Sequence, residues 1–519
     1  MRNIIRKSLS LLLVLAMIAG FIYLPTPVDI KADAATNSAT GGTSLTQYVQ
    51  DGATLQCWNW SFNNIKANMG LIANLGYSSI QVSPPQEGKE GSVNKPFNNW
   101  WVLYQPISFN FNENPNNAVG TKDEFIALCN EAHKYGIRVI VDVISNHLAD
   151  DGGTTITPSP LIPEDILNDR SCWHTEYNVQ SSNYADRYDI TQRAMKLPDL
   201  NTSNKKIQNY VLNYLKACID YGADGFRYDA AKQIETPDDY YTYASDFWPT
   251  IINGANEYAS STRGIMLYHY GEMLANPDES GSLPVTAYTK YMSVTENAWS
   301  NDIRHFMHYG DVNGIQTNLN KGYFKQCNAD KLILWPESHD TYWDGIMNED
   351  KSWYYGPNQA YSHEVGKDAL NRTYAFLAAR AYAMSLYFAR PNDMLYQEMG
   401  DIAKTGWSDD SVKAVNWFKN HFAGQDERCS TYGNFAYVER GDSGVVLVNV
   451  QEGYNFLISV INGAAGGLGF TLAIVLFASV RERVNKTECP ECFKGFPIAL
   501  IAAGLLALAF MGFSGLSIF

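Results

Sequence analysis

Charged and imidazole side chains gather where four apolar stretches in the middle of the chain end. These ends read DVISNH (142–147), GFRYDAAK (225–232), GE (271–272) and WPESHD (335–340). The residues there that could do chemistry are Asp142, His147, Arg227, Asp229, Glu272, His339 and Asp340. One carboxylate after a strand is usually a helix cap, but clustered carboxylates repel one another and cost stability. A group of this kind therefore indicates a reaction site.

Cleavage of a glycosidic bond is the reaction that this set of residue types fits best. It needs a nucleophile or base, a protonated acid, and negative charge beside an oxocarbenium-like transition state. Arg227 lies two residues before Asp229, hence on the same face of a strand, so we expect its guanidinium to hold Asp229 ionised. Glu272, packed among carboxylates, is expected to have a raised pKa, as a general acid requires. Spacings typical of a Ser-His-Asp triad or of Cys/His metal ligands are absent from this part of the sequence.

Strand patterns and helical patterns alternate from about Thr54 to Arg390. The strand candidates are 54–59, 77–83, 137–144, 224–229, 266–272, 291–295, 331–338 and 385–390, with helical patterns such as 121–136 and 204–222 between them. Continuous apolar runs followed by helices predict a parallel sheet covered on both faces, and eight such units fit a (β/α)8 TIM barrel better than an open doubly wound sheet. No glycine-rich phosphate-binding turn follows any of these runs. Because the carboxyl ends of barrel strands share one mouth, the four charged ends are expected to meet there.

The segment between the third strand and helix 204–222 is too long for a simple loop. It contains clusters of Pro, Gly, Asn and Tyr. We therefore expect an α/β fold in which a small subdomain at 148–195 is inserted after the third strand of the barrel.

The composition excludes one class of partner. Lys+Arg 39 against Asp+Glu 54 gives the 519 residues a formal net charge of −15. A chain this acidic is repelled by phosphate backbones and gains nothing from counterion release, so no nucleic-acid binding is expected. Hydrophobic residues make up 45%, enough for a large packed core, and eight cysteines are too few for a disulfide scaffold.

The first residues of the chain have the three parts of a secretory signal. Arg2, Arg6 and Lys7 precede an uncharged apolar run (9–24), and Ala32-Asp33-Ala34 follows. We interpret 1–34 as a cleaved signal peptide and 35–47 as a linker, the alternative being an uncleaved anchor. Both interpretations predict export.

The end of the chain has membrane composition. Residues 456–480 and 495–519 are two uncharged apolar runs, each longer than the roughly 20 residues that cross a bilayer. They predict a transmembrane hairpin over 455–519, the alternative being a buried soluble hairpin. The loop between the runs carries Cys489 and Cys492, which could be a redox or zinc pair. No second ligand pair lies nearby, so incidental thiols are the preferred interpretation.

The four charged segments, in this order, resemble the signature segments of the α-amylase family of glycoside hydrolases, in particular secreted bacterial enzymes of the Bacillus subtilis type. The stretches CWNWSFNNIKANM, NNWWVLYQP and DRYDITQRAMKLPDLNT resemble that family as well, over about residues 45–450. The resemblance implies a retaining reaction with Asp229 as nucleophile, Glu272 as general acid/base and Asp340 as transition-state stabiliser. It also implies substrate contacts from Tyr104, Gln105, His147, Arg227, Lys232 and His339.

The same resemblance implies a structural Ca²⁺ between barrel and subdomain. The matching positions are Asn146 and Asp199 through side chains, and Thr191 and Gln233 through backbone carbonyls. An all-oxygen set with one carboxylate is reasonable for Ca²⁺. Family members usually have His where this chain has Gln233, but a carbonyl ligand survives that change. The alternative is that Asn146 and Asp199 are loop caps.

After the barrel (48–425), NFAYVERGDSGVVLVNV (434–450) resembles the beginning of the antiparallel β-domain of the same family, here truncated and placed at 426–454. Residues 455–519 resemble the last two helices of a Rnf-type electron-transport membrane subunit. That family's iron–sulfur cysteines belong to helices that this chain does not contain, so no redox function is carried over.

These patterns favour an exported endo-hydrolase of α-1,4-glucans such as starch and glycogen, tethered by its hairpin to the outer face of the cytoplasmic membrane if the chain is made as written. A related hydrolase or transglycosylase of the same family (maltogenic or pullulan-cleaving) is the first alternative. Others are a starch-binding protein without activity, a membrane electron-transport component, and a non-functional fusion of two unrelated fragments. The sequence leaves the oligomeric state open.

Overall fold

The computed structural model describes residues 45–89, 97–183, 186–274, 285–322, 327–343, 362–391, 397–403 and 406–451, except for the side chains of Phe97, Asn98 and Trp343. The chain divides into two compact units, Met1–Val450 and Gln451–Phe519. The predicted signal peptide (1–34) and transmembrane hairpin (455–519) lie outside the described residues. Within the described ranges, none of the helices combines the length and the apolar character that a membrane span needs.

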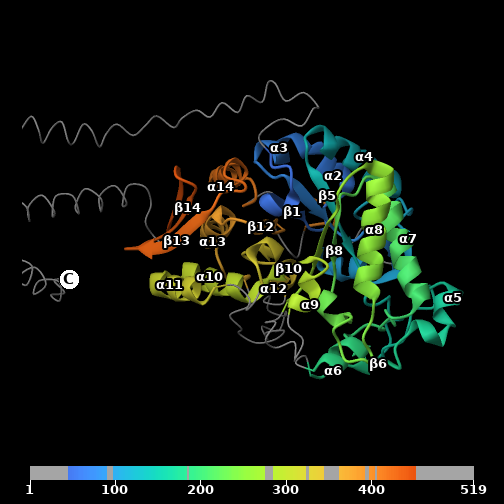
Figure 1. The fold of residues 1–519 in the computed structure, drawn as a ribbon. Coiled ribbons are helices and arrows are strands. Elements are labelled where there is room, and N and C mark those ends of the chain that lie inside the picture. The colour runs from blue at the N-terminus through green and yellow to red at the C-terminus, as the bar shows by residue number, and fades with distance from the viewer. Residues whose placement is uncertain are drawn as a thin grey trace, which may run out of the picture. The chain divides into compact units, whose positions relative to one another are not determined.

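Eight parallel strands close into a barrel (Figure 1). Its strands are β1 (Ala53–Cys57), β2 (Ser79–Val82), β5 (Arg138–Val143), β8 (Gly225–Tyr228), β9 (Tyr268–Gly271), β10 (Ser293–Glu296), β11 (Leu332–Leu334) and β12 (Met384–Phe388). Neighbours around the barrel follow the chain, and β1 pairs with β12 to close it. Each strand overlaps one of the predicted stretches, so the TIM-barrel prediction is confirmed.

The strands read as apolar runs because the barrel interior covers one face and helices cover the other. In β5 every residue after Arg138 is buried. Outside the segment between β5 and α7, the described helices are α2 (Phe62–Ala67), α3 (Met69–Asn74), α4 (Lys122–Lys134), α7 (Lys205–Tyr221), α8 (Phe247–Arg263), α9 (Thr286–Thr289), α10 (Asn297–Tyr309), α11 (Val312–Lys321), α12 (His339–Trp343), α13 (Lys367–Ala379) and α14 (Asp410–His421). A capping box of Thr121 and Glu124 begins α4, and Gly222, at φ +115°, ends α7. Local sequence signals therefore set these helix ends.

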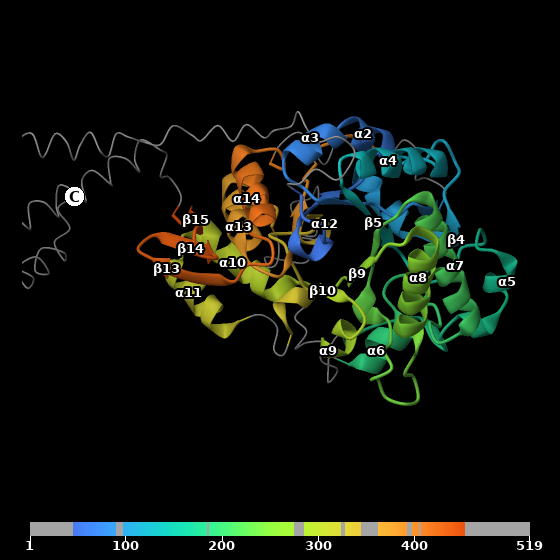
Figure 2. The ribbon, with the colours of Figure 1, turned by 45° about the horizontal axis from the view of Figure 1, so that its top comes forward.

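The segment between β5 and α7 forms a small satellite on the barrel (Figures 1 and 2). It contains α5 (Glu164–Leu167), β6 (Glu176–Gln180), α6 (Arg187–Gln192) and β7 (Arg193–Ala194), with β6 and β7 paired in parallel. Leu200 returns the chain to the barrel by donating its N–H to the carbonyl of Asn146 at 2.9 Å. The satellite therefore joins the barrel at the end of β5.

A three-stranded antiparallel sheet follows α14. Its strands are β13 (Glu427–Tyr432), β14 (Phe435–Arg440) and β15 (Gly444–Asn449). The guanidinium of Arg440 donates to the carbonyls of Ala379 (3.0 Å) and Phe422 (2.5 Å), and Arg380 binds the Glu427 carboxylate through two nitrogens. These contacts hold the inner face of the sheet on α13 and α14. Its outer face exposes Tyr432, Phe435, Val445 and Leu447.

Candidate active site

The guanidinium of Arg227, in β8, lies at the centre of a carboxylate cluster at the carboxyl ends of three adjacent strands. Its Nη1 lies 2.6 Å from Oδ1 of Asp142 (β5) and 2.8 Å from Oδ1 of Asp229. Its Nη2 lies 2.5 Å from Oε1 of Glu272, which follows β9. All four side chains are buried. The strand order β5–β8–β9 therefore brings together residues that are far apart in the sequence.

The backbone turn after Asp229 adds a contact to Glu272. Ala230 has a left-handed conformation (φ +48°, ψ +35°), which is uncommon for a residue with a side chain. Its N–H donates to Oε2 of Glu272 at 3.0 Å. Strained backbone of this kind is concentrated at functional sites. The turn thus holds the Glu272 carboxylate beside Asp229.

Tyr104 and His147 line the next part of the cluster. The Tyr104 hydroxyl donates to Oδ2 of Asp142 at 3.1 Å, and Nε2 of His147 lies 3.0 Å from the Tyr104 carbonyl. Nδ1 of His147 is buried, and no group in the described part of the chain hydrogen-bonds it. Burial lowers the pKa of His147 to about 4, so the ring is neutral at pH 7. Because Nε2 carries the proton that it donates to the Tyr104 carbonyl, Nδ1 can accept a hydrogen bond from a ligand hydroxyl.

An aromatic cage holds His339 at the end of the seventh barrel strand. The ring stacks on Trp58 and on Tyr104, each with centroids 5.2 Å apart, and meets Trp100 edge-on. Burial lowers the pKa of His339 well below its usual range, with Arg227 adding to the effect. Nε2 lies 3.5 Å from Oδ2 of Asp340, whose side chain is partly exposed. The cage fixes a neutral imidazole beside the Asp340 carboxylate.

The pKa values of Glu272 and Asp229 are both raised, and the sequence predicted this rise only for Glu272. Burial raises the pKa of Glu272, and the neighbouring Asp229 charge adds to that rise, as predicted in direction. The contact predicted between Arg227 and Asp229 is present and lowers the pKa of Asp229, but burial raises that pKa by more. The sequence shows the neighbouring charge but not the depth at which both groups lie.

The other two predicted substrate residues lie at the same mouth. Gln105 precedes β4 (Pro106–Phe111), and its side-chain Oε1 is buried with no hydrogen bond from any described residue. Lys232 is buried in the short 3₁₀ turn Ala231–Gln233 that follows Asp229. Its carbonyl accepts hydrogen bonds from Arg187 (2.7 Å) and Tyr288 (3.1 Å). All nine predicted catalytic and substrate residues therefore lie at strand ends, in the loops and 3₁₀ turns that follow strands, or at the start of α12.

A second polar network joins the barrel to the satellite. Nδ2 of Asn146 donates to Oδ1 of Asp199 at 3.1 Å. The His174 ring bridges Asp199 (2.6 Å) and Glu235 (2.8 Å), and all three of these side chains are buried. Burial opposes the charge of His174 and lowers its pKa. The two carboxylates outweigh this effect, with Glu235 contributing most, and raise the pKa to about 10. Gln192 donates from its side chain to Glu235. The predicted metal positions Thr191 and Gln233 are thus close chain neighbours of this network.

Comparison with known proteins agrees with the geometry. Residues 110–332 match the family model described as "Alpha amylase, catalytic domain". A protein named "Alpha-amylase" from Clostridium acetobutylicum is 32% identical over 459 residues, which is 87% of this chain and 54% of that protein. The chain contains an alpha-amylase catalytic domain over residues 110–332. Asp229 and Glu272 lie inside the matched range, and Asp340 lies beyond its end.

Solved structures share the fold of this alpha-amylase domain at low sequence identity. Wild-type alpha-amylase I from Eisenia fetida aligns with a TM-score of 0.58 and 18% identity over 77% of this chain and 84% of that one. The alpha-amylase from Geobacillus thermoleovorans, complexed with acarbose, aligns with a TM-score of 0.57 and 14% identity over 78% and 87%. The chain spans about half the length of the first curated alpha-amylases that it matches, 54% and 42%.

The end of the chain matches a different family. Residues 443–517 match the model described as "Rnf-Nqr subunit, membrane protein". A component of the Na(+)-translocating ferredoxin:NAD(+) oxidoreductase complex of Acetobacterium woodii is 55% identical over 75 residues, 14% of this chain and 39% of that protein. The match begins at residue 443, not at 455 as the sequence suggested. β15 (Gly444–Asn449) therefore lies in the Rnf-Nqr match, although it pairs with β14. The run VVLVNV is apolar and β-branched, so its strand pattern does not reveal which family it comes from.

Three residues that no sequence pattern singled out contact the predicted site residues. Trp58 and Trp100 form two walls of the cage around His339, and His174 joins the two carboxylates at the satellite. The segment CWNW contains the only sequence signal for Trp58: a tryptophan directly after the first barrel strand. No local signal marks His174, because its partners Asp199 and Glu235 lie far along the chain.

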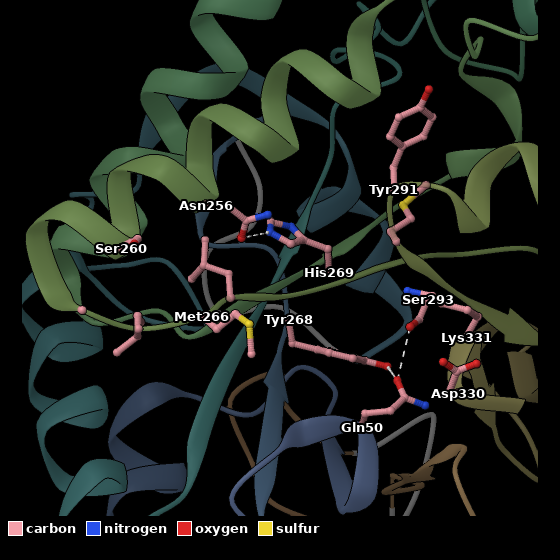
Figure 3. Close-up of a pocket in the computed structure, with 14 residues that line it drawn as sticks. Gln50, Asn256, Ser260, Met266, Tyr268, His269, Tyr291, Ser293, Asp330 and Lys331 are labelled. Atoms are coloured by element: carbon pink, nitrogen blue, oxygen red, sulfur yellow. Dashed lines mark hydrogen bonds between the residues drawn. The ribbon is translucent and has the colours of Figure 1, made fainter.

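A surface hollow of about 660 Å³ lies at the opposite end of the alpha-amylase barrel (Figure 3). It is lined by residues at the starts of β9 and β10, among them Tyr268, His269 and Ser293. Gln50 accepts hydrogen bonds from Tyr268 (2.5 Å) and Ser293 (3.2 Å), and His269 Nε2 lies 3.1 Å from Asn256. These polar groups satisfy one another, and none belongs to the carboxylate cluster.

Proposed function

We propose that the chain is a retaining endo-hydrolase of α-1,4-glucosidic bonds in starch, glycogen and related glucans. The observation that carries this proposal is the single Arg227 guanidinium that contacts Asp229 and Glu272 through different nitrogens. Two carboxyl groups held on one guanidinium favour the short separation, about 5–5.5 Å, of retaining glycosidases over the wider spacing that leaves room for a water. The alpha-amylase domain match supports the same chemistry.

In the proposed reaction, two carboxyl groups carry the steps. Asp229 attacks the anomeric carbon as a carboxylate while Glu272, whose pKa burial raises, gives its proton to the leaving glycosidic oxygen. A glycosyl ester on Asp229 results. Glu272, now a carboxylate, takes a proton from water, and the hydroxide oxygen displaces Asp229 with a second inversion. Asp340 would stabilise the oxocarbenium-like charge of both transition states.

We assign the remaining substrate contacts to polar groups beside the carboxylate cluster, some of them without hydrogen-bond partners among the described residues. Nδ1 of His147 and Oε1 of Gln105 are buried without hydrogen-bond partners among the described residues, so they are positioned to meet sugar hydroxyls. Tyr104 and His339, whose rings stack on each other, would meet the sugar with their polar edges beside Asp340, and Lys232 would contact glucan one subsite beyond the cleaved bond. Leaving such groups unpaired is costly, and a bound sugar would remove that cost.

The test is the appearance of reducing ends from soluble starch with purified full-length chain. Asp229→Asn should remove activity by several orders of magnitude, whereas Asp220→Asn, a change on the exposed surface of α7, should not alter it. Proton NMR of the first product should show the α-anomer, as retention requires. An initial β-anomer, or an active Asp229→Asn variant, would contradict the proposal. The set of product lengths would identify a maltogenic, pullulan-cleaving or transglycosylating relative.

We also propose a structural Ca²⁺ at the junction of barrel and satellite. Asn146 and Asp199 touch, and the chain neighbours of Thr191 and Gln233 belong to the same buried network. Asp199 is a buried carboxylate whose pKa burial raises to about 7, and an adjacent cation would favour its charged form. Bound Ca²⁺ would supply a divalent positive charge that links the two parts through oxygen ligands. Asn146 and Asp199 offer oxygen atoms of the kind that Ca²⁺ prefers.

For the tail we propose export of the enzyme and retention at the outer face of the membrane. The Rnf-Nqr match over 443–517 suggests membrane association, and the alpha-amylase domain suggests an enzyme of the cell exterior. The basic, apolar and small-residue order of residues 1–34 supports a signal peptide. The competing proposal is that the chain is a non-functional fusion. The exposed apolar side chains on the outer face of the β13–β15 sheet favour aggregation, which would prevent function.

A further inference from the structure

Four tyrosines form a cluster beside the active-site mouth, three of them exposed and Tyr243 half-buried. Tyr240 and Tyr241, in the loop between β8 and α8, expose 59% and 79% of their surface, and Tyr188 of α6 exposes 40%. The Tyr188 and Tyr243 ring centroids lie 5.7 Å apart, and those of Tyr240 and Tyr241 lie 4.4 Å apart. Tyr240 and Tyr243, at 6.3 Å, join the two pairs into one cluster, which we call the tyrosine platform.

The loop that carries the platform is held rigidly. Ser245 donates its N–H to the carbonyl of Thr236, which closes the loop on itself. The guanidinium of Arg187 binds both carboxylate oxygens of Asp239 at 2.9 Å, and both side chains are buried. Rings exposed from a fixed loop lose little conformational entropy when they bind a ligand. A rigid, exposed aromatic cluster is therefore suited to binding.

Hydrogen bonds connect the platform with Lys232, one of the predicted substrate residues. Arg187, which holds the loop and precedes Tyr188 in α6, also donates to the carbonyl of Lys232 at 2.7 Å. Tyr288 of α9 donates to the carbonyls of Lys232 and Ile234, and α6 and α9 lie side by side in both views (Figures 1 and 2). The same hydrogen bonds therefore position both Lys232 and the tyrosine platform.

The chemistry of the platform favours a carbohydrate over a protein surface. In α6 and the 236–246 loop, the exposed large apolar side chains are all tyrosines, with no exposed Leu, Ile, Val, Met or Phe among them. Tyrosine offers a flat apolar face to the C–H face of a sugar and a hydroxyl to its edge. The ring planes of Tyr240 and Tyr241 are tilted by 52°, and those of Tyr188 and Tyr243 by 78°. Tilted rings suit a curved α-glucan better than a flat β-glucan ribbon.

We propose that the tyrosine platform is a second α-glucan-binding site, outside the catalytic groove, that holds long or granular substrate at the mouth. The proposal rests on the proposed function for its ligand class. It predicts that Tyr240→Ser/Tyr241→Ser weakens binding to starch granules about tenfold, equivalent to ~1.4 kcal/mol. The matched control is Tyr309→Ser/Tyr432→Ser, which removes two tyrosines of similar exposure, 69% and 82%, elsewhere on the surface.

The experiment measures sedimentation of the full-length chain with starch granules, in the Asp229→Asn background so that the glucan stays intact. The platform variant should remain in the supernatant while the control sediments like the unsubstituted chain. Equal sedimentation of all three, or the same loss in the control, would overturn the proposal. Tyrosine-dependent retention on microcrystalline cellulose as strong as on starch would overturn its assignment to α-glucans.

Rates of hydrolysis on two substrates distinguish a failure of the tyrosine platform from a failure of the proposed enzymatic function. In chains with Asp229 restored, the ratio of rates on granular starch to p-nitrophenyl maltotrioside should fall about tenfold in the platform variant only. Failure of the proposed function would appear as no product from either substrate with the unsubstituted chain. Granule binding that depends on Tyr240 and Tyr241 would support the platform even then.

Discussion

Nη2 of Arg227 lies 2.5 Å from Oε1 of Glu272, and the two residues come from adjacent strands, β8 and β9. The same guanidinium contacts Asp142 and Asp229 through Nη1. One positive charge therefore faces three buried carboxyl groups, whose pKa values burial raises. The surplus of acidic groups favours a proton on the cluster, and a proton on Glu272 is what the acid step of glycoside cleavage uses.

Glu272→Gln should lower starch hydrolysis by several orders of magnitude, because the amide cannot protonate a sugar leaving group. With α-maltosyl fluoride, whose leaving group needs no proton, the first step should be far less affected. The comparison of the two substrates in burst kinetics checks the role. Equal losses on both would assign Glu272 a structural task. The melting temperature should not fall, since a buried carboxyl group is replaced by a neutral isostere.

Arg227→Gln should destabilise the fold by about 3–5 kcal/mol, because it leaves three buried carboxyl groups without their cation. The loss should be larger at pH 8 than at pH 5. Burial raises the pKa of Asp142 to about 7 and also raises those of Asp229 and Glu272, so the folded cluster binds more protons at pH 5 and needs less counter-charge there. Urea unfolding at both pH values measures the difference. Arg227→Lys is the charge-preserving control, and a pH-independent loss would argue against the cluster.

Chelator should lower the melting temperature and added Ca²⁺ should restore it, because an ion bound only by the folded chain stabilises it by mass action. The stabilisation is about 2.7 kcal/mol when free Ca²⁺ is about 100 times its dissociation constant. Asp199→Asn should abolish the response to Ca²⁺. Scanning calorimetry of metal-analysed protein checks this. An identical melting temperature with and without bound Ca²⁺ would remove the proposed site.

Glu296 gives a pH prediction that is independent of the catalytic cluster. Burial raises its pKa to about 8, while its carboxylate accepts the N–H of Ser300 at the start of α10. The folded state therefore holds this proton up to higher pH than the unfolded chain, whose pKa is near 4.5. The stabilising contribution is complete below pH 4.5 and is lost as pH rises towards 8.

Glu296→Gln should consequently show a smaller decline in melting temperature between pH 5 and pH 8 than the unsubstituted chain. The lost contribution is worth about 1.4 kcal/mol for each pKa unit. Glu398→Gln, outside the described helices and strands, serves as the control. Parallel melting curves for the Glu296 variant and the unsubstituted chain would show that this carboxyl group titrates normally.

Tethering predicts that the loop between the two apolar runs faces the cytoplasm. Arg481, Arg483, Lys486 and Lys494 lie near the ends of the runs, as the positive-inside tendency requires. Protease added to wall-stripped cells should destroy the amylase antigen of the membrane fraction and leave a protected fragment containing 481–494. Antigen confined to the medium or to insoluble aggregates would reject tethering.

The order of the elements and the identity of the site were readable from the sequence alone. Each barrel strand is a short apolar run because both of its faces are covered, and the polar residues of the mouth come directly after those runs. DVISNH, GFRYDAAK, GE and WPESHD therefore indicated both the fold and the chemistry. Local capping signals such as Thr121 with Glu124 also defined helix ends, because they depend only on neighbouring residues.

Tertiary structure decided what depends on depth and on distant partners. The pKa of Asp229 is raised by burial despite Arg227, and no sequence spacing shows that burial. The contact of His174 with Asp199 and Glu235, and the tyrosine platform, form only when the satellite folds back onto the loop after β8. Sequence specifies side-chain chemistry and local periodicity, whereas solvation and long-range contacts exist only after the chain has packed.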